Sequence, residues 1–82
     1  NTLAGDLFAE WRGEMLELLE AAIVREVREK NVDLAARELT PRAMVETFLD
    51  ALEGMKPRIS DPHSHLAAAR SNARVLVAAL RP

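Results

Sequence analysis

The chain has 82 residues, no cysteine and a formal net charge of −2 at pH 7, which excludes a disulfide-stabilised scaffold and argues against a phosphate-binding surface. Hydrophobic residues make up 49% of it, but no apolar run approaches the roughly 20 residues that span a bilayer. No signal segment is recognisable, so the sequence predicts one cytoplasmic domain over residues 1–82. At this size the core is close to the minimum for independent folding.

The first predicted element is one long helix over residues 3–30. It contains no proline, and its weak points are Gly5 and Gly13. Two apolar stripes form an arc wider than one neighbouring helix can cover, so we expect this helix to contact two others. The main stripe comprises Leu7, Phe8, Trp11, Met15, Leu18, Leu19 and Ala22, and the second comprises Leu16, Ile23 and Val27.

Residues 31–39 are predicted to connect this helix to the next. The segment NVDLAARE fits either a loop with buried Val32 and Leu34 or a brief helical turn. Neither alternative is excluded by its composition, because it combines helix-forming alanines with turn-forming Asn31 and Asp33.

The second predicted helix, over residues 41–55, has the clearest ends. Thr40 is a candidate N-cap, and Pro41 suits the first helical position, where a missing N–H costs nothing. Three residues mark its stop: Gly54, Lys56 and Pro57. Its apolar residues fall on one side and comprise Met44, Val45, Phe48, Leu52 and Met55.

A third helix is predicted over residues 62–80, with Ser60 or Asp61 as the cap before Pro62. Its apolar residues follow steps of three and four, which is typical of a helix–helix seam. The seam comprises Leu66, Ala69, Ala73, Leu76 and Leu80, with Val77 beside them. It can serve contacts inside one three-helix antiparallel bundle or contact with a second copy. We favour the second copy, because three helices with these stripes offer more apolar face than they can bury together.

Charge is unevenly distributed. Residues 3–30 and 31–55 each carry a net charge of −3, whereas residues 56–82 carry +4. The first helix has an acidic row, which we interpret as a solvent face, the alternative being an acidic docking surface: Asp6, Glu10, Glu14, Glu17 and Glu20. The one basic cluster has no interleaved aromatic residues, which favours a solvated face over a DNA-binding one. It comprises Lys56, Arg58, Arg70, Arg74 and Arg81.

No pattern in the sequence points to catalysis. It has no serine or cysteine nucleophile beside a histidine, no glycine-rich phosphate loop and no paired-histidine helix motif, so we expect neither enzyme activity nor a cofactor. The closest approach to a metal site is DPHSH, with His63 and His65. At the start of a helix these two rings point to different sides, and no third ligand is visible, so no metal site is predicted.

Trp11 is the best candidate for a ligand-binding residue. A single indole beside Met15 and Leu18 can line an apolar effector pocket, with its N–H free for a polar group. The alternative is that Trp11 belongs to the core or to an interface, where tryptophan on an apolar stripe is more often found.

Three segments follow one another in a recognisable order. They are LFAEWRGEMLELLEAAI at residues 7–23, the capped LTPRAMVETFLDALEGM at residues 39–55, and an alanine-rich last helix. This order resembles the C-terminal half of TetR-like bacterial transcriptional repressors, in which a helix ending in a Leu-Asp-Gly-Leu-like turn precedes the last helix. Residues 48–55, FLDALEGM, correspond to that turn, with Glu53 where the family often has aspartate.

The resemblance implies the regulatory and homodimerisation domain of a longer transcriptional regulator, without its DNA-binding head. The last two helices would then form a two-fold, four-helix dimer interface, and the first helix would flank the pocket of a small apolar effector. The interface candidates are Val45, Phe48, Leu52, Leu66, Ala69, Ala73, Leu76 and Leu80. The alternative is a free-standing helical adaptor that binds a partner helix. In either case we expect no contact of this chain with nucleic acid or membrane.

Overall fold

The computed structural model describes residues 3–55 and 59–82, and all regular secondary structure in these ranges is helical. The helices are α1 (Leu3–Lys30), α2 (Pro41–Met55) and α3 (Pro62–Ala79), with a 3₁₀ turn, η1 (Ala35–Arg37), between α1 and α2. The predicted all-α, three-helix fold is confirmed. Three residues singled out in the sequence lie outside the described ones, namely the stop signals Lys56 and Pro57 and the basic Arg58.

The connector between α1 and α2 combines the two predicted alternatives. Val32 and Leu34 are both buried, and the 3₁₀ turn η1 follows them. Asn31 adopts a left-handed backbone (φ 56°), and the Val32 N–H donates to the Val27 carbonyl at 3.1 Å, which closes α1 with a Schellman-type cap. Glu38 repeats the left-handed geometry (φ 57°) after η1. Two such reversals in a few residues bring α2 back along α1.

The predicted N-cap of α2 is confirmed. Thr40 Oγ1 accepts the Ala43 N–H at 3.1 Å, which satisfies one of the free donors at the helix start. We expect Thr40→Ala to lower the free energy of unfolding by about 1 kcal/mol and Thr40→Ser to keep most of it. Urea denaturation followed by circular dichroism measures both, and equal midpoints for Thr40→Ala and the wild type would contradict the capping role.

At the start of α3, Asp61 rather than Ser60 is the cap. Its Oδ2 accepts the Ser64 hydroxyl and the Ser64 N–H, each at 2.8 Å. The hydroxyl bond and then the N–H bond hold the pKa of Asp61 below its ordinary value. The carboxylate therefore stabilises the fold above the ordinary pKa, and this contribution is lost as the pH falls through the lowered pKa.

Asp61→Asn isolates this effect, because asparagine caps a helix without titrating. We expect the wild type to be more stable than Asp61→Asn at neutral pH and to lose that advantage below about pH 4. Parallel urea titrations of the two proteins across this range give the difference directly. A difference that stays constant with pH would show that the charge of Asp61 has no part in the cap.

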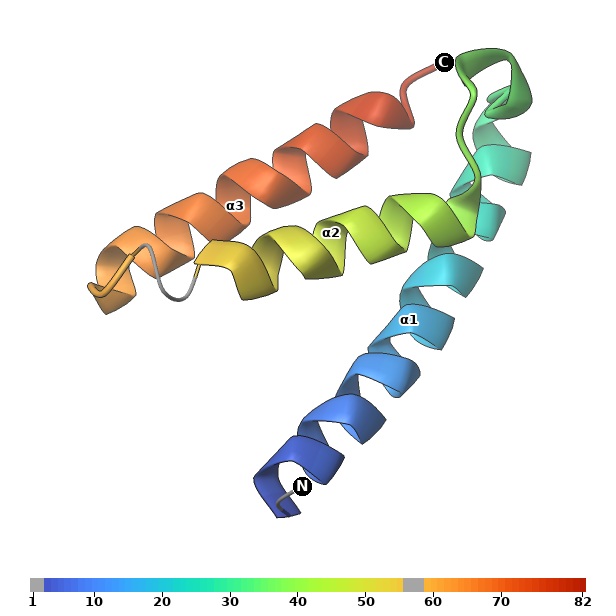
Figure 1. The fold of residues 1–82 in the computed structure, drawn as a ribbon. Helices are drawn as coiled ribbons and strands as arrows, with labels where there is room; N and C mark the ends of the chain where they lie inside the picture. The colour runs from blue at the N-terminus through green and yellow to red at the C-terminus, as the bar shows by residue number, and fades with distance from the viewer. Residues whose placement is uncertain (1–2, 56–58) are drawn as a thin grey trace.

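Helix α2 lies between the other two helices and contacts both (Figure 1). It is antiparallel to α1, since Arg12 pairs with Asp50 while Glu20 pairs with Arg42 at 3.3 Å. Helix α3 runs back alongside α2, whereas α1 slants away from the α2–α3 pair. Among the described residues the helices α1 and α3 do not pack on each other, so the prediction that α1 contacts two helices is wrong for the single chain.

The core lies where α2 meets the end of α1 and the connector. Its only buried residue from α1 is Ile23, which belongs to the second predicted stripe rather than the main one. Leu18 of the main stripe is 67% exposed, because the side of α1 that carries Leu16, Ile23 and Val27 packs on α2. The buried hydrophobic side chains are Ile23, Val32, Leu34, Met44, Val45, Leu49, Met55 and Leu80.

Candidate functional site

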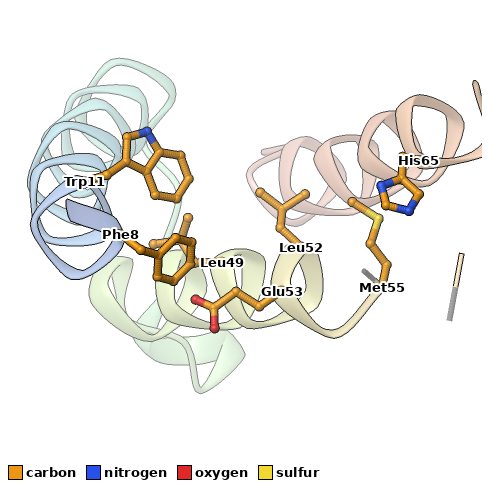
Figure 2. Close-up of a pocket in the computed structure, with 7 residues that line it drawn as sticks. All are labelled: Phe8, Trp11, Leu49, Leu52, Glu53, Met55 and His65. Carbon is orange, nitrogen blue, oxygen red and sulfur yellow. The ribbon is translucent and has the colours of Figure 1, made fainter. Parts of the chain in front are cut away.

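A groove of about 390 Å³ opens between α1 and α3, with α2 as its floor (Figure 2). We call it the α1/α3 groove. It exists because α2 holds the two outer helices apart, so that their facing sides are not filled by each other. The described residues that line it are apolar except for one carboxylate and one imidazole, and comprise Phe8, Trp11, Leu49, Leu52, Glu53, Met55 and His65.

The α1 wall of the groove is aromatic. The ring centroids of Phe8 and Trp11 lie 5.7 Å apart, with the planes tilted by 31°. Trp11 is 44% exposed, so it lines an open surface rather than the core of the described chain. Of the predicted effector-binding residues it alone lines the groove. Met15 packs against the core and Leu18 points to solvent, since both lie further along α1 than the groove extends.

A charged cluster joins α1 to α2 at the edge of the groove. Arg12 donates to Asp50 at 2.7 Å and also to Glu53, which lines the groove. The hydrogen bond to Asp50, together with the charge and hydrogen bond of Glu53, raises the pKa of Arg12 above its ordinary value. The guanidinium of Arg12 thus pairs with two carboxylates. The cluster of Arg12, Asp50 and Glu53 therefore carries a net charge of −1.

At the α3 end of the groove, backbone and side-chain contacts fix His65. Its Nε2 donates to the Ile59 carbonyl, so the ring is held at the groove wall. Further along, Asn72 Nδ2 donates to the Phe48 carbonyl at 3.0 Å and ties α3 to α2. His63 is exposed, and no three metal-binding side chains come together within residues 3–55 and 59–82.

The structure places some of the predicted dimer residues in the core of the single chain and others at its surface. Val45 is 0% exposed and Leu80 is also buried, so both belong to the core of the single chain, and their contact with a second copy stays a prediction. Val45 is buried because the inner face of α2 is already covered by α1 and α3, and Leu80, at the end of α3, belongs to the same core cluster. Half-buried positions are Phe48, Leu52, Ala69, Ala73 and Leu76, whereas Leu66 is exposed.

A second, smaller groove of about 180 Å³ lies between α2 and α3, and no α1 residue lines it. We call its surroundings the α2/α3 face. Val75 on α3 is 70% exposed there, and Ala43 and Thr47 on α2 are exposed as well. The full lining comprises Leu39, Ala43, Met44, Thr47, Val75, Leu76 and Ala79.

Sequence reasoning missed most of this face. Val75 lies off the predicted seam, and only Leu76 of the dimer candidates lines the second groove. One available signal was the spacing of small residues, since Ala43, Thr47 and Ala51 recur every fourth residue on one side of α2. Such a stripe allows another helix to approach closely.

Compared with known proteins, the chain matches no protein-family model, no curated protein and no solved structure. Among the described helices none combines the length and the apolar character that a membrane crossing requires. The features that distinguish the candidate functions are therefore the two grooves and the charges beside them.

Proposed function

We propose that this chain is a homodimerisation and effector-binding domain of the kind found in TetR-like transcriptional regulators. The α2/α3 face is the dimer interface, and the α1/α3 groove binds a small, mainly apolar effector. The observation that carries the proposal is that α2 and α3 share an exposed apolar face on the side that α1 leaves uncovered.

Geometry favours this face for a four-helix interface. Two copies of an α2–α3 pair need a surface built from both helices and free of α1, and the lining of the second groove comes from α2 and α3 except for Leu39, which directly precedes α2. Small side chains at Ala43 and Thr47 let the helices of a second copy approach closely. The protruding Val75 of each copy is placed to fill the groove of the other.

Charges at the edges of the face support a two-fold pairing. Glu46 is exposed on α2, and Arg74 is exposed on α3. In a two-fold dimer, α2 of each copy packs on α3 of the other. The acidic edge of α2 then lies beside the basic edge of α3 in both of these symmetry-related contacts. The small core of the single chain also favours association, because an added interface buries apolar surface that 82 residues cannot cover alone.

Sedimentation equilibrium of the wild-type chain at concentrations of roughly tens of micromolar tests the dimer directly. A dimer that dissociates on dilution supports the proposal. A monomer throughout this range overturns it, whatever the groove binds.

A helical adaptor is the second candidate, and the exposed stripe of α1 favours it. Leu3, Leu7 and Leu18 are all exposed, and such a stripe on one helix suits docking of a partner helix. The gene distinguishes the two functions: a helix-turn-helix encoded upstream in the same reading frame supports the regulator. A monomeric chain whose frame encodes these residues alone supports the adaptor.

A further inference from the structure

We propose that the α1/α3 groove selects amphipathic cations, that is, ligands with a bulky apolar body and a positively charged group such as a quaternary ammonium or phosphonium. This inference rests on the proposed effector role of the groove and adds the charge of the ligand. A groove of about 390 Å³ falls in the size range of small-molecule sites.

The excess carboxylate is the first argument. Among the lining residues within 3–55 and 59–82, Glu53 is the only carboxylate, and none is a lysine or an arginine. Arg12 reaches Glu53 from outside the lining and keeps Asp50 at 2.7 Å as a second partner. Glu53 can therefore turn to a bound cation while Arg12 remains paired, and one unit of negative charge is available to the ligand.

Because the cluster of Arg12, Asp50 and Glu53 is exposed to solvent, this exchange costs little free energy. The side chains of Glu53 and Asp50 are 40% and 70% exposed. Ion pairs in such surroundings are screened by water and contribute little to stability, so breaking one of the two contacts of Arg12 costs the fold little. The ligand cation then replaces the guanidinium at the Glu53 carboxylate.

The aromatic wall is the second argument. A cation within about 6 Å of an aromatic ring is attracted to the ring face, and tryptophan binds it best. Trp11 is open to solvent, and Phe8 lies beside it. Figure 2 shows the Glu53 carboxylate on the same side of the groove as Phe8, so the charge and the rings act on one end of a ligand. The floor residues Leu49 and Leu52 receive the apolar body.

Three probes of similar shape separate charge from apolar contact: tetraphenylphosphonium, tetraphenylborate and the neutral triphenylphosphine oxide. Trp11 is the only tryptophan of the chain, which has no tyrosine, so its fluorescence reports binding at the groove. We expect a saturable change with the phosphonium and a dissociation constant at least about tenfold higher for the borate.

Two variants test the origin of the selectivity. Glu53→Gln removes the charge from the groove and should weaken phosphonium binding about tenfold without weakening borate binding. Asp50→Asn changes no lining residue but leaves Glu53 as the sole carboxylate on Arg12, so it should weaken phosphonium binding as well. Glu29→Gln removes the same charge from an exposed position near the end of α1, away from the groove, and should leave binding unchanged.

The outcomes are distinct. Equal binding of all three probes overturns the inference and leaves an apolar effector groove. Phosphonium binding that survives both Glu53→Gln and Asp50→Asn overturns it too. Absence of binding by every probe overturns the inference together with the effector part of the proposed function. None of these results bears on the dimer, which sedimentation measures separately.

Discussion

Replacing Val75 with glutamate is expected to convert the proposed dimer into a monomer. Val75 is 70% exposed in the single chain, so the substitution removes no core contact and should leave the fold intact. In the proposed dimer the new carboxylate would be buried against the groove lined by Ala43 and Thr47, whose described lining residues carry no charge. We expect the dissociation constant to rise at least about 100-fold.

Val77→Glu is the matched control, because it makes the same change two residues further along α3. Val77 is 56% exposed but does not line the second groove. Sedimentation equilibrium should therefore show a monomer for Val75→Glu and a dimer for Val77→Glu, with equal helix content by circular dichroism. The opposite result would move the interface to the side of α3 that carries Leu66 and Ala73.

Leu49→Ala is expected to cause the largest loss of stability of any single truncation at the floor of the α1/α3 groove. Leu49 is 1% exposed, and its removal leaves a cavity between α1 and α2. Leucine-to-alanine changes in cores cost about 3 kcal/mol or more. A chain of this length has a total stability of only about 4–12 kcal/mol, so a substantial share of it would be lost.

Leu18→Ala makes the same substitution at a leucine that is 67% exposed. It should change the free energy of unfolding by less than about 0.5 kcal/mol. Urea denaturation of the two variants at one fixed protein concentration gives the comparison, since dimerisation makes stability depend on concentration. Similar losses for the two variants would mean that α1 packs on α2 with a different side.

The helix ends could be predicted from the sequence because their determinants are local. Thr40 and Asp61 cap helices through hydrogen bonds that span three residues, and Pro41 and Pro62 follow them directly. Such signals depend on no distant part of the chain. The all-α class followed for the same reason, since it needs only composition and periodicity.

The side of each helix that is buried could be predicted less accurately than the helix ends, because it depends on the direction from which a neighbouring helix packs. Leu49 was left out of the predicted apolar side of α2, yet it is among the most buried residues, since α1 covers that side of α2 while α3 covers the other. Likewise, the sequence offers two stripes on α1, and only packing decides that Ile23 rather than Trp11 enters the core.

The groove was predicted only through Trp11. Its polar members come from distant parts of the chain: Glu53 from the end of α2 and His65 from the first turns of α3. The local motifs that contain them, FLDALEGM and DPHSH, do not mark either residue as part of a groove, and their meeting with Trp11 results from the way α1 and α3 pack on α2. The second groove depends in the same way on the pairing of α2 with α3.

Helix α1 is attached to the rest of the described chain along its C-terminal half, where residues from Met15 to Val27 pack against the core, and through the ion pairs of Arg12. The residues of α1 before Arg12 extend beyond these core contacts. About 18 Å of helix separates Met15 from Leu3, so a rotation of about 5° at Met15 moves Leu3 by roughly 1.5 Å. A ligand that draws Glu53 away from Arg12 would weaken the attachment nearest to this end, and a small local change at the groove would become a larger displacement at the N-terminal end of the helix.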